Sequence, residues 1–115
     1  MSTTIVAGTI EISAENRDRA LSEAAQLMVD TRSQAGCNHY VWAADPGSDT
    51  RIYVYEEWAS TEALASHLAG EYYSGMLGHL SNFDLQNVEV KKYQVAREQA
   101  VYDSQGVARA DFFDE

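Results

Sequence analysis

Hydrophobic and polar residues alternate along residues 4–12, which predicts a β-strand. From about Ala14 to Ala35 apolar residues instead recur at helical intervals, and Ser13 is a candidate N-cap for that helix. Gly36 follows where a left-handed C-terminal cap is expected. The alternation divides the first strand into two faces. One face carries Val6, Gly8, Ile10 and Ile12, and the other carries Ile5, Ala7, Thr9 and Glu11.

The middle of the chain predicts two strands followed by a helix. Residues 37–43 and 51–58 are rich in β-branched and aromatic residues, which are typical of strands. Residues 45–49 contain the chain's single proline and predict the turn between these strands. Ser60 is then the candidate N-cap of a helix over about 61–69.

The last third of the chain predicts a second helical piece over 71–82, separated from the first by Gly70, and a final strand over 88–95. The resulting order, β-α-β-β-α-β, predicts a ferredoxin-like α+β fold. In this fold both helices cover one face of an antiparallel sheet. We expect one domain over residues 1–95 and an acidic C-terminal tail over 96–115.

Two strands are apolar on both faces, although the helices can cover only one face of the sheet. In the strand over 51–58, for example, Ile52 and Val54 oppose Tyr53 and Tyr55. An uncovered apolar face of this size favours a twofold partner, so we expect a homodimer. Two alternatives stay open for the tail: it is disordered, or it packs on the partner subunit through Phe112 and Phe113.

The composition excludes several classes of partner. The 115 residues carry a formal net charge of −10 with only 8 Lys and Arg, so we expect neither nucleic acid nor a membrane surface as a partner. No apolar run approaches a transmembrane helix, and the N-terminus does not resemble a secretory signal. The lone Cys37 fits a reducing compartment, so we expect the cytoplasm.

Three histidines and several aromatic residues are candidates for a functional site. His67 lies beside the apolar stripe of its predicted helix, where it is either a structural histidine or a pocket residue. His39 faces either a pocket or the dimer interface, and His79 is either a pocket residue or a surface or capping residue. No histidine pair has metal-ligand spacing, so no metal is expected. The remaining candidates are Tyr40, Trp58 and Tyr72.

One set of residues resembles a known family, the antibiotic biosynthesis monooxygenase domains of the dimeric α/β-barrel superfamily. The matching residues are Gly36-Cys37, Tyr40, Tyr55-Glu56-Glu57-Trp58, Ser60, Ala63-Leu64, His67 and Val88-Glu89-Val90. The resemblance implies a dimer whose two sheets face each other, with a pocket between sheet and helices in each subunit. Some relatives oxygenate polyketide-like phenols with molecular oxygen alone, whereas others oxidise quinols, degrade haem or isomerise small sugars.

The resemblance carries over to this chain only in part. Trp58 matches a pocket tryptophan of the polyketide oxygenases. Their asparagine four residues earlier and tyrosine six residues later are Val54 and Leu64 here. Haem degradation is not expected, because Leu77 stands where the haem-degrading branch has its ligating histidine.

We therefore expect a cofactor-independent monooxygenase or quinol oxidase that acts on a small aromatic or polyketide-like phenol. Molecular oxygen would be its co-substrate. His67 would be the base, because the ordinary pKa of a histidine is near neutrality, as proton removal from the substrate requires. Tyr72 would be a phenolic donor. Two alternatives remain, a small-carbonyl isomerase and a non-catalytic dimeric ligand-binding or stress protein. The expected pocket residues are Trp58, His39, Tyr40 and His79.

Overall fold

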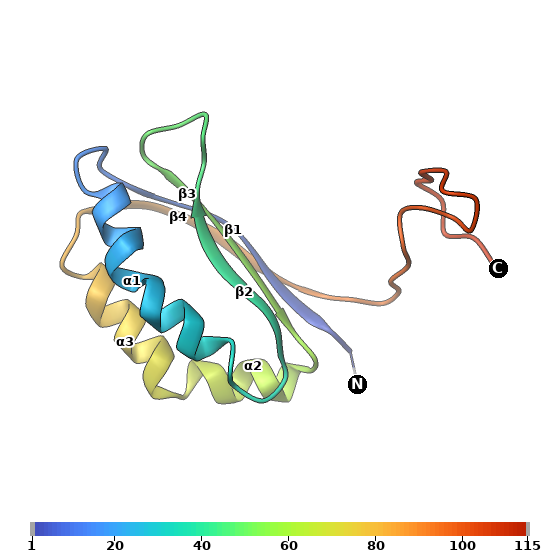
Figure 1. Ribbon diagram of the computed structural model, residues 1–115. Coiled ribbons are helices and arrows are strands. Elements are labelled where there is room, and N and C mark those ends of the chain that lie inside the picture. Colours follow the sequence, from blue (N-terminus) through green and yellow to red (C-terminus); the bar gives the residue numbers. More distant parts are fainter. Residues whose placement is uncertain (1, 115) are drawn as a thin grey trace.

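A computed structural model describes residues 2–114. Within them, four strands form one antiparallel sheet in the order β2-β3-β1-β4, and the helices lie on one of its faces (Figure 1). This arrangement confirms the predicted ferredoxin-like α+β fold. The elements are β1 (Thr4–Ile12), α1 (Arg17–Thr31), β2 (Cys37–Ala44), β3 (Arg51–Trp58), α2 (Thr61–Leu68), α3 (Glu71–Leu80) and β4 (Leu85–Gln94).

None of the helices in residues 2–114 has both the length and the apolar character needed to cross a bilayer.

The first helix is shorter than its sequence pattern predicts. It begins at Arg17 rather than near Ala14, because the hydroxyl of Ser13 donates to Asp84 (2.8 Å) instead of capping the helix. The N–H groups of Asn16 and Arg17 both donate to the carbonyl of Ser13, so a turn precedes the helix. The helix also ends at Thr31 instead of reaching Ala35.

One predicted helix boundary, the Ser60 cap, is confirmed in the middle of the chain, whereas Gly36 has the predicted conformation but does not cap α1. The side chain of Ser60 caps α2 and accepts a hydrogen bond from the N–H of Ala63 (3.1 Å). Gly36 has φ = 82°, the left-handed conformation predicted for it, although it lies in the turn before β2 rather than at the helix end. A Cβ at Gly36 would lie 2.5 Å from the Cβ of Ala63, so glycine also permits the close approach of α2.

The two faces of the sheet differ in their surroundings. The face toward the helices carries the hydrophobic core, in which Ile12, Ile52 and Trp58 are fully buried. The opposite face, which we call the open face, is uncovered in Figure 1. Large apolar side chains are exposed there, as the two-faced strand pattern predicts: Val41, Tyr53, Tyr55 and Tyr93.

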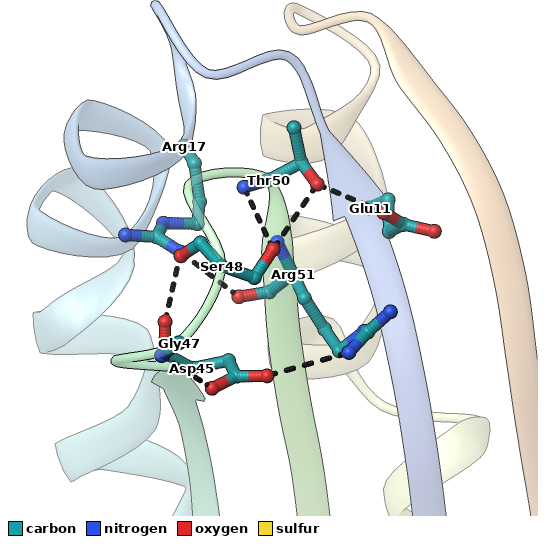
Figure 2. Close-up of polar contacts among 7 residues, drawn as sticks. All are labelled: Glu11, Arg17, Asp45, Gly47, Ser48, Thr50 and Arg51. Carbon is teal, nitrogen blue, oxygen red and sulfur yellow. Dashed lines mark hydrogen bonds and ion pairs between the residues drawn. The ribbon is translucent and has the colours of Figure 1, made fainter.

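A buried arginine attaches α1 to the connection between β2 and β3. The guanidinium of Arg17 donates to the backbone carbonyls of Asp45, Ser48 and Arg51 (Figure 2). The carboxylate of Asp45 accepts from the N–H of Gly47 (2.8 Å) and from the guanidinium of Arg51 (3.4 Å). The turn around the chain's single proline is therefore held by hydrogen bonds both from within and from the helix.

Residues 96–114 form a small lobe apart from the sheet and helices, which we call the C-terminal lobe (Figure 1). Tyr102 pairs with Ala108 in an antiparallel bridge, and the amide of Gln99 brackets the backbone of Phe113 through a donor and an acceptor contact. Phe113 is buried within this lobe, whereas Tyr102 and Phe112 are 65% and 55% exposed. The lobe thus has internal order but leaves large apolar side chains uncovered.

We predict that Arg17→Met lowers the free energy of unfolding by about 2 kcal/mol, because backbone carbonyls of the turn lose a charged donor while the apolar stem is retained. Urea unfolding followed by circular dichroism would measure the change. Arg19→Met is the matched control, since Arg19 is exposed on the same helix, pairs loosely with Glu23, donates to Asn16 (3.4 Å) and lies over the ring of Phe83. It should cost less than about 1 kcal/mol. Equal losses in the two variants would contradict the proposed attachment.

Candidate active site

A cavity of about 330 Å³ lies between the sheet and the helices α2 and α3. Its wall is mostly apolar, with contributions from all four strands. This size and character are typical of sites for small aromatic molecules. The polar or aromatic side chains on the wall are Tyr40, Trp42, Glu56, His67, Tyr73, Lys91 and Lys92.

Strand pairing places four of the lining residues in one row across the sheet. Glu56 on β3 is paired with Tyr40 on one side and with Val6 on the other, and Val6 is paired with Lys92 on β4. All four line the cavity, so the row forms part of its floor. We call Tyr40, Glu56, Val6 and Lys92 the central row.

Glu56 is a carboxylate held almost entirely out of water, with 6% of its surface exposed. Burial raises its pKa, and the hydrogen bond from the indole N–H of Trp58 to its Oε1 (3.1 Å) lowers it in part. The nearby indole N–H of Trp42 also lowers this pKa, although it lies outside hydrogen-bonding geometry. Glu56 is therefore an acid–base group in an apolar cavity.

From the sequence, Glu56 is named only among the residues that resemble the family, and this role is not predicted. The strand pattern does contain a sign of this burial. Glu56 is spaced by two residues from its neighbours on the buried face of β3, which also carries Ile52, Val54 and Trp58.

His67 lies at the junction of the cavity and the core and is 2% exposed. Its ring stacks on Trp58 with the centroids 4.6 Å apart, and Tyr40 and Tyr73 approach it edge-on at 5.6 and 5.8 Å. Nδ1 lies 2.7 Å from Oε1 of Gln34. Burial lowers the pKa of His67, so the neutral imidazole is favoured near pH 7.

The hydrogen bond to Gln34 determines which ring nitrogen of His67 can accept a proton. An amide oxygen can only accept, so Nδ1 carries the hydrogen and Nε2 keeps a free lone pair. Nε2 has no hydrogen-bond partner among residues 2–114. The arrangement therefore provides a neutral, pre-oriented base.

Trp58 and Tyr40 contribute in different ways. Trp58 is fully buried and lies behind the wall rather than on it, where it holds Glu56 by a hydrogen bond and His67 by stacking. Tyr40 lines the cavity, and burial followed by the Glu56 carboxylate raises the pKa of its phenol, so Tyr40 stays protonated. The indole N–H of Trp42 is buried on the wall and lacks a hydrogen-bond partner within residues 2–114.

Three candidate residues lie away from the cavity. Tyr72 is half-buried and does not line it, whereas the next residue, Tyr73, does. His39 lies on the open face, 6.3 Å from the ring of Tyr55. His79 points toward α1, where its Nε2 lies 2.9 Å from the carbonyl oxygen of Ala20.

The two departures from the polyketide oxygenases, Val54 and Leu64, are both buried and both line the cavity. Hydrocarbon thus occupies the positions of a polar pair in those relatives.

Burial raises the pKa of Cys37, which keeps it a neutral thiol. In the part of the chain that the structure describes, no three His, Cys, Asp or Glu side chains gather closely enough to hold a metal ion.

Solved structures of bacterial and archaeal proteins share this fold. A candidate antibiotic biosynthesis monooxygenase from Deinococcus radiodurans is 20% identical, with a TM-score of 0.69 over 90% of this chain and 100% of that one. PA3566 from Pseudomonas aeruginosa is 29% identical, with a TM-score of 0.63 over 85% and 95% of the two chains. A candidate monooxygenase of the same description from Caulobacter crescentus is 15% identical, with a TM-score of 0.72 over 84% and 91%.

A sequence relative and a family model agree with these structures. The uncharacterised protein sll1783 of Synechocystis sp. is 23% identical over 97 residues, which are 84% of this chain and 66% of that protein. The chain thus spans just under two thirds of the length of this relative. The family model described as antibiotic biosynthesis monooxygenase matches residues 3–77, which include β1, α1, both strands of the central hairpin, α2 and most of α3. The chain belongs to the antibiotic biosynthesis monooxygenase family.

Proposed function

We propose that this protein is a cofactor-independent monooxygenase or quinol oxidase for a small aromatic or polyketide-like phenol, with molecular oxygen as co-substrate. One observation carries the proposal: a neutral histidine and a buried carboxylate of raised pKa line the same apolar, aromatic cavity. Such a pair can remove one proton and supply another within an apolar cavity.

The proposed reaction needs only acid–base groups from the protein. A base removes a proton from an activated carbon or hydroxyl, and the resulting carbanion or phenolate passes an electron to oxygen. For an anthrone, this electron transfer gives a substrate radical and superoxide, which join at the carbon to form a peroxide. The peroxide then loses water, so one oxygen atom enters the product and the other leaves as water. For a quinol, two electrons and two protons pass to oxygen, which gives the quinone and hydrogen peroxide.

We assign the first proton transfer to Nε2 of His67, because Gln34 holds the hydrogen on Nδ1. Glu56 would deliver a proton to the departing oxygen, since burial raises the pKa of its carboxyl and so favours the protonated form more than in water. Tyr73 replaces Tyr72 as the phenolic donor, because only Tyr73 lines the cavity. The indole N–H of Trp42 is available to a developing enolate oxygen.

We also propose a homodimer that forms through the open face. Its exposed tyrosines would be an unusual surface for a monomer, and the family generally forms dimers. The C-terminal lobe lies apart from the rest of its own chain with Tyr102 and Phe112 exposed, which suits packing on the partner subunit.

The first prediction concerns the base. His67→Gln should lower kcat/KM by about 100-fold, measured as oxygen consumption with a panel of anthrones and quinols. In the wild type, the rate should fall only below pH 6.5, because burial lowers the pKa of His67 and keeps the imidazole neutral at higher pH.

His79→Gln is the matched control, since His79 is half-buried on α3 but outside the cavity. It should retain near-normal turnover. Full turnover by His67→Gln would remove His67 from the mechanism. If the wild type consumes no oxygen with any compound of the panel, the oxygenase proposal fails; turnover without oxygen would indicate the isomerase, and binding without turnover the ligand-binding protein.

The second prediction concerns Glu56. When burial raises the pKa of a carboxyl in the folded state, the free energy of unfolding decreases as the pH rises toward that pKa. The reason is that the folded protein must then hold a buried charge. Glu56→Gln should therefore raise the free energy of unfolding at pH 8, and the gain should shrink as the pH falls toward the ordinary range of a carboxyl. Turnover should fall at least about tenfold.

Glu57→Gln is the control for this change, because Glu57 lies on the opposite face of β3, where it accepts a hydrogen bond from Tyr55 (2.9 Å). It should show neither the stabilisation nor the loss of turnover. A Glu56→Gln variant that is less stable than the wild type at pH 8 would show that the carboxylate has a structural role.

The third prediction concerns assembly. Tyr53→Glu should shift the protein toward the monomer in sedimentation equilibrium, because the open faces of a dimer would bring the added carboxylates into an apolar interface. Val29→Glu, on an exposed position of α1, should leave the equilibrium unchanged.

Deletion of residues 96–115 should weaken the dimer at least about tenfold; an unchanged equilibrium would exclude an essential role of the lobe in dimer formation.

A further inference from the structure

The only two lysines of the chain are adjacent and both line the cavity. They are Lys91 and Lys92 on β4, in a protein with 18 acidic residues and a formal net charge of −10. Neither forms an ion pair with a side chain of residues 2–114. Lys92 thus places a positive charge, without a counter-charge among the described residues, at one edge of an apolar cavity, whereas strand alternation directs the side chain of Lys91 toward the open face.

The central row fixes where this charge lies relative to the acid–base groups. Lys92 and Glu56 are paired with the same residue, Val6, from its two sides. Two strand spacings therefore separate Lys92 from Glu56, which is a distance of about 10 Å. Because Val6, Lys92 and Glu56 share the face toward the helices, a flat molecule lying over Val6 would reach both.

The two ends of the cavity favour different chemical groups. At one end, the buried carboxyl of Glu56 disfavours an anion and accepts or donates a proton. At the β4 edge, the ammonium of Lys92 attracts an anion. The apolar side chain of Val6 lies between these ends and suits the face of an aromatic ring.

We propose that the cavity binds an aromatic acid, with its anionic group at Lys92 and its phenolic or reacting end at Glu56, Tyr40 and His67. The proposal rests on the proposed function for the identity of the reacting end, and it names the substrate class. A span of about 10 Å matches a two-ring phenol with its carboxylate at the far end. Lys92 would act as a specificity determinant and would also orient the ligand.

A different role for Lys92 must be separated from this one. Lysine on an edge strand such as β4 discourages association with further strands, and that role requires no ligand. Edge protection would affect solubility or association. It would not change the preference between a charged and an uncharged ligand of the same shape, so the test must measure that preference.

The experiment compares 6-hydroxy-2-naphthoate with its neutral methyl ester by isothermal titration calorimetry on the full chain at pH 8. The wild type should bind the acid more tightly than the ester, and Lys92→Gln should weaken the acid about fivefold while the ester stays within about twofold. Arg19→Gln, which removes the same charge from α1 outside the cavity, should leave both affinities within about twofold. Salt at about 0.5 M should weaken only the acid.

Three results would overturn the proposal: equal affinity of the wild type for acid and ester, loss of both ligands to the same extent in Lys92→Gln, or no binding of either ligand. These outcomes are distinct from failure of the proposed function. Selective binding of the acid without oxygen consumption would leave the ligand class standing and remove the oxygenase. Oxygen consumption with neutral phenols and no preference for acids would do the reverse.

Discussion

The hydrogen bond from the indole of Trp58 to the carboxylate of Glu56 joins the packing of this protein to its candidate chemistry. Trp58 is fully buried, and its ring also supports that of His67. A carboxylate inside an apolar interface is costly unless a donor satisfies it, and here the donor is a core residue. The position of both acid–base groups therefore depends on the same side chain that fills the end of the core.

The sequence predicts those parts of the structure that depend on local periodicity. β1, β3 and the Ser60 cap follow from alternation and capping chemistry within a few residues. The beginning of α1 does not, because the hydroxyl of Ser13 is occupied by Asp84, which is distant in sequence. Long-range hydrogen bonds of this kind leave no periodic signal.

The same distinction explains which site residues could be predicted. The register of β2 shifts between Cys37 and His39, so Cys37 packs against the core while His39 faces the other side, although alternation alone puts them on one face. Tyr72 and Tyr73 differ by 100° around a helix whose phase restarts after Gly70, so only the fold distinguishes them. His67 needed no such correction, because its place beside the apolar stripe of α2 is local.

Strand alternation also separates two surfaces with different demands. The face of the sheet toward the helices holds a buried carboxyl, together with an indole N–H and a lysine that have no polar partner or counter-charge within residues 2–114. Each such group lowers stability relative to an apolar residue, which is consistent with a functional role for this face. The open face carries aromatic side chains and suits association. Because neighbouring residues on β3 serve opposite faces, a one-residue shift of register would place Glu56 on the open face and remove the site, which makes correct strand pairing a condition for function as well as for folding.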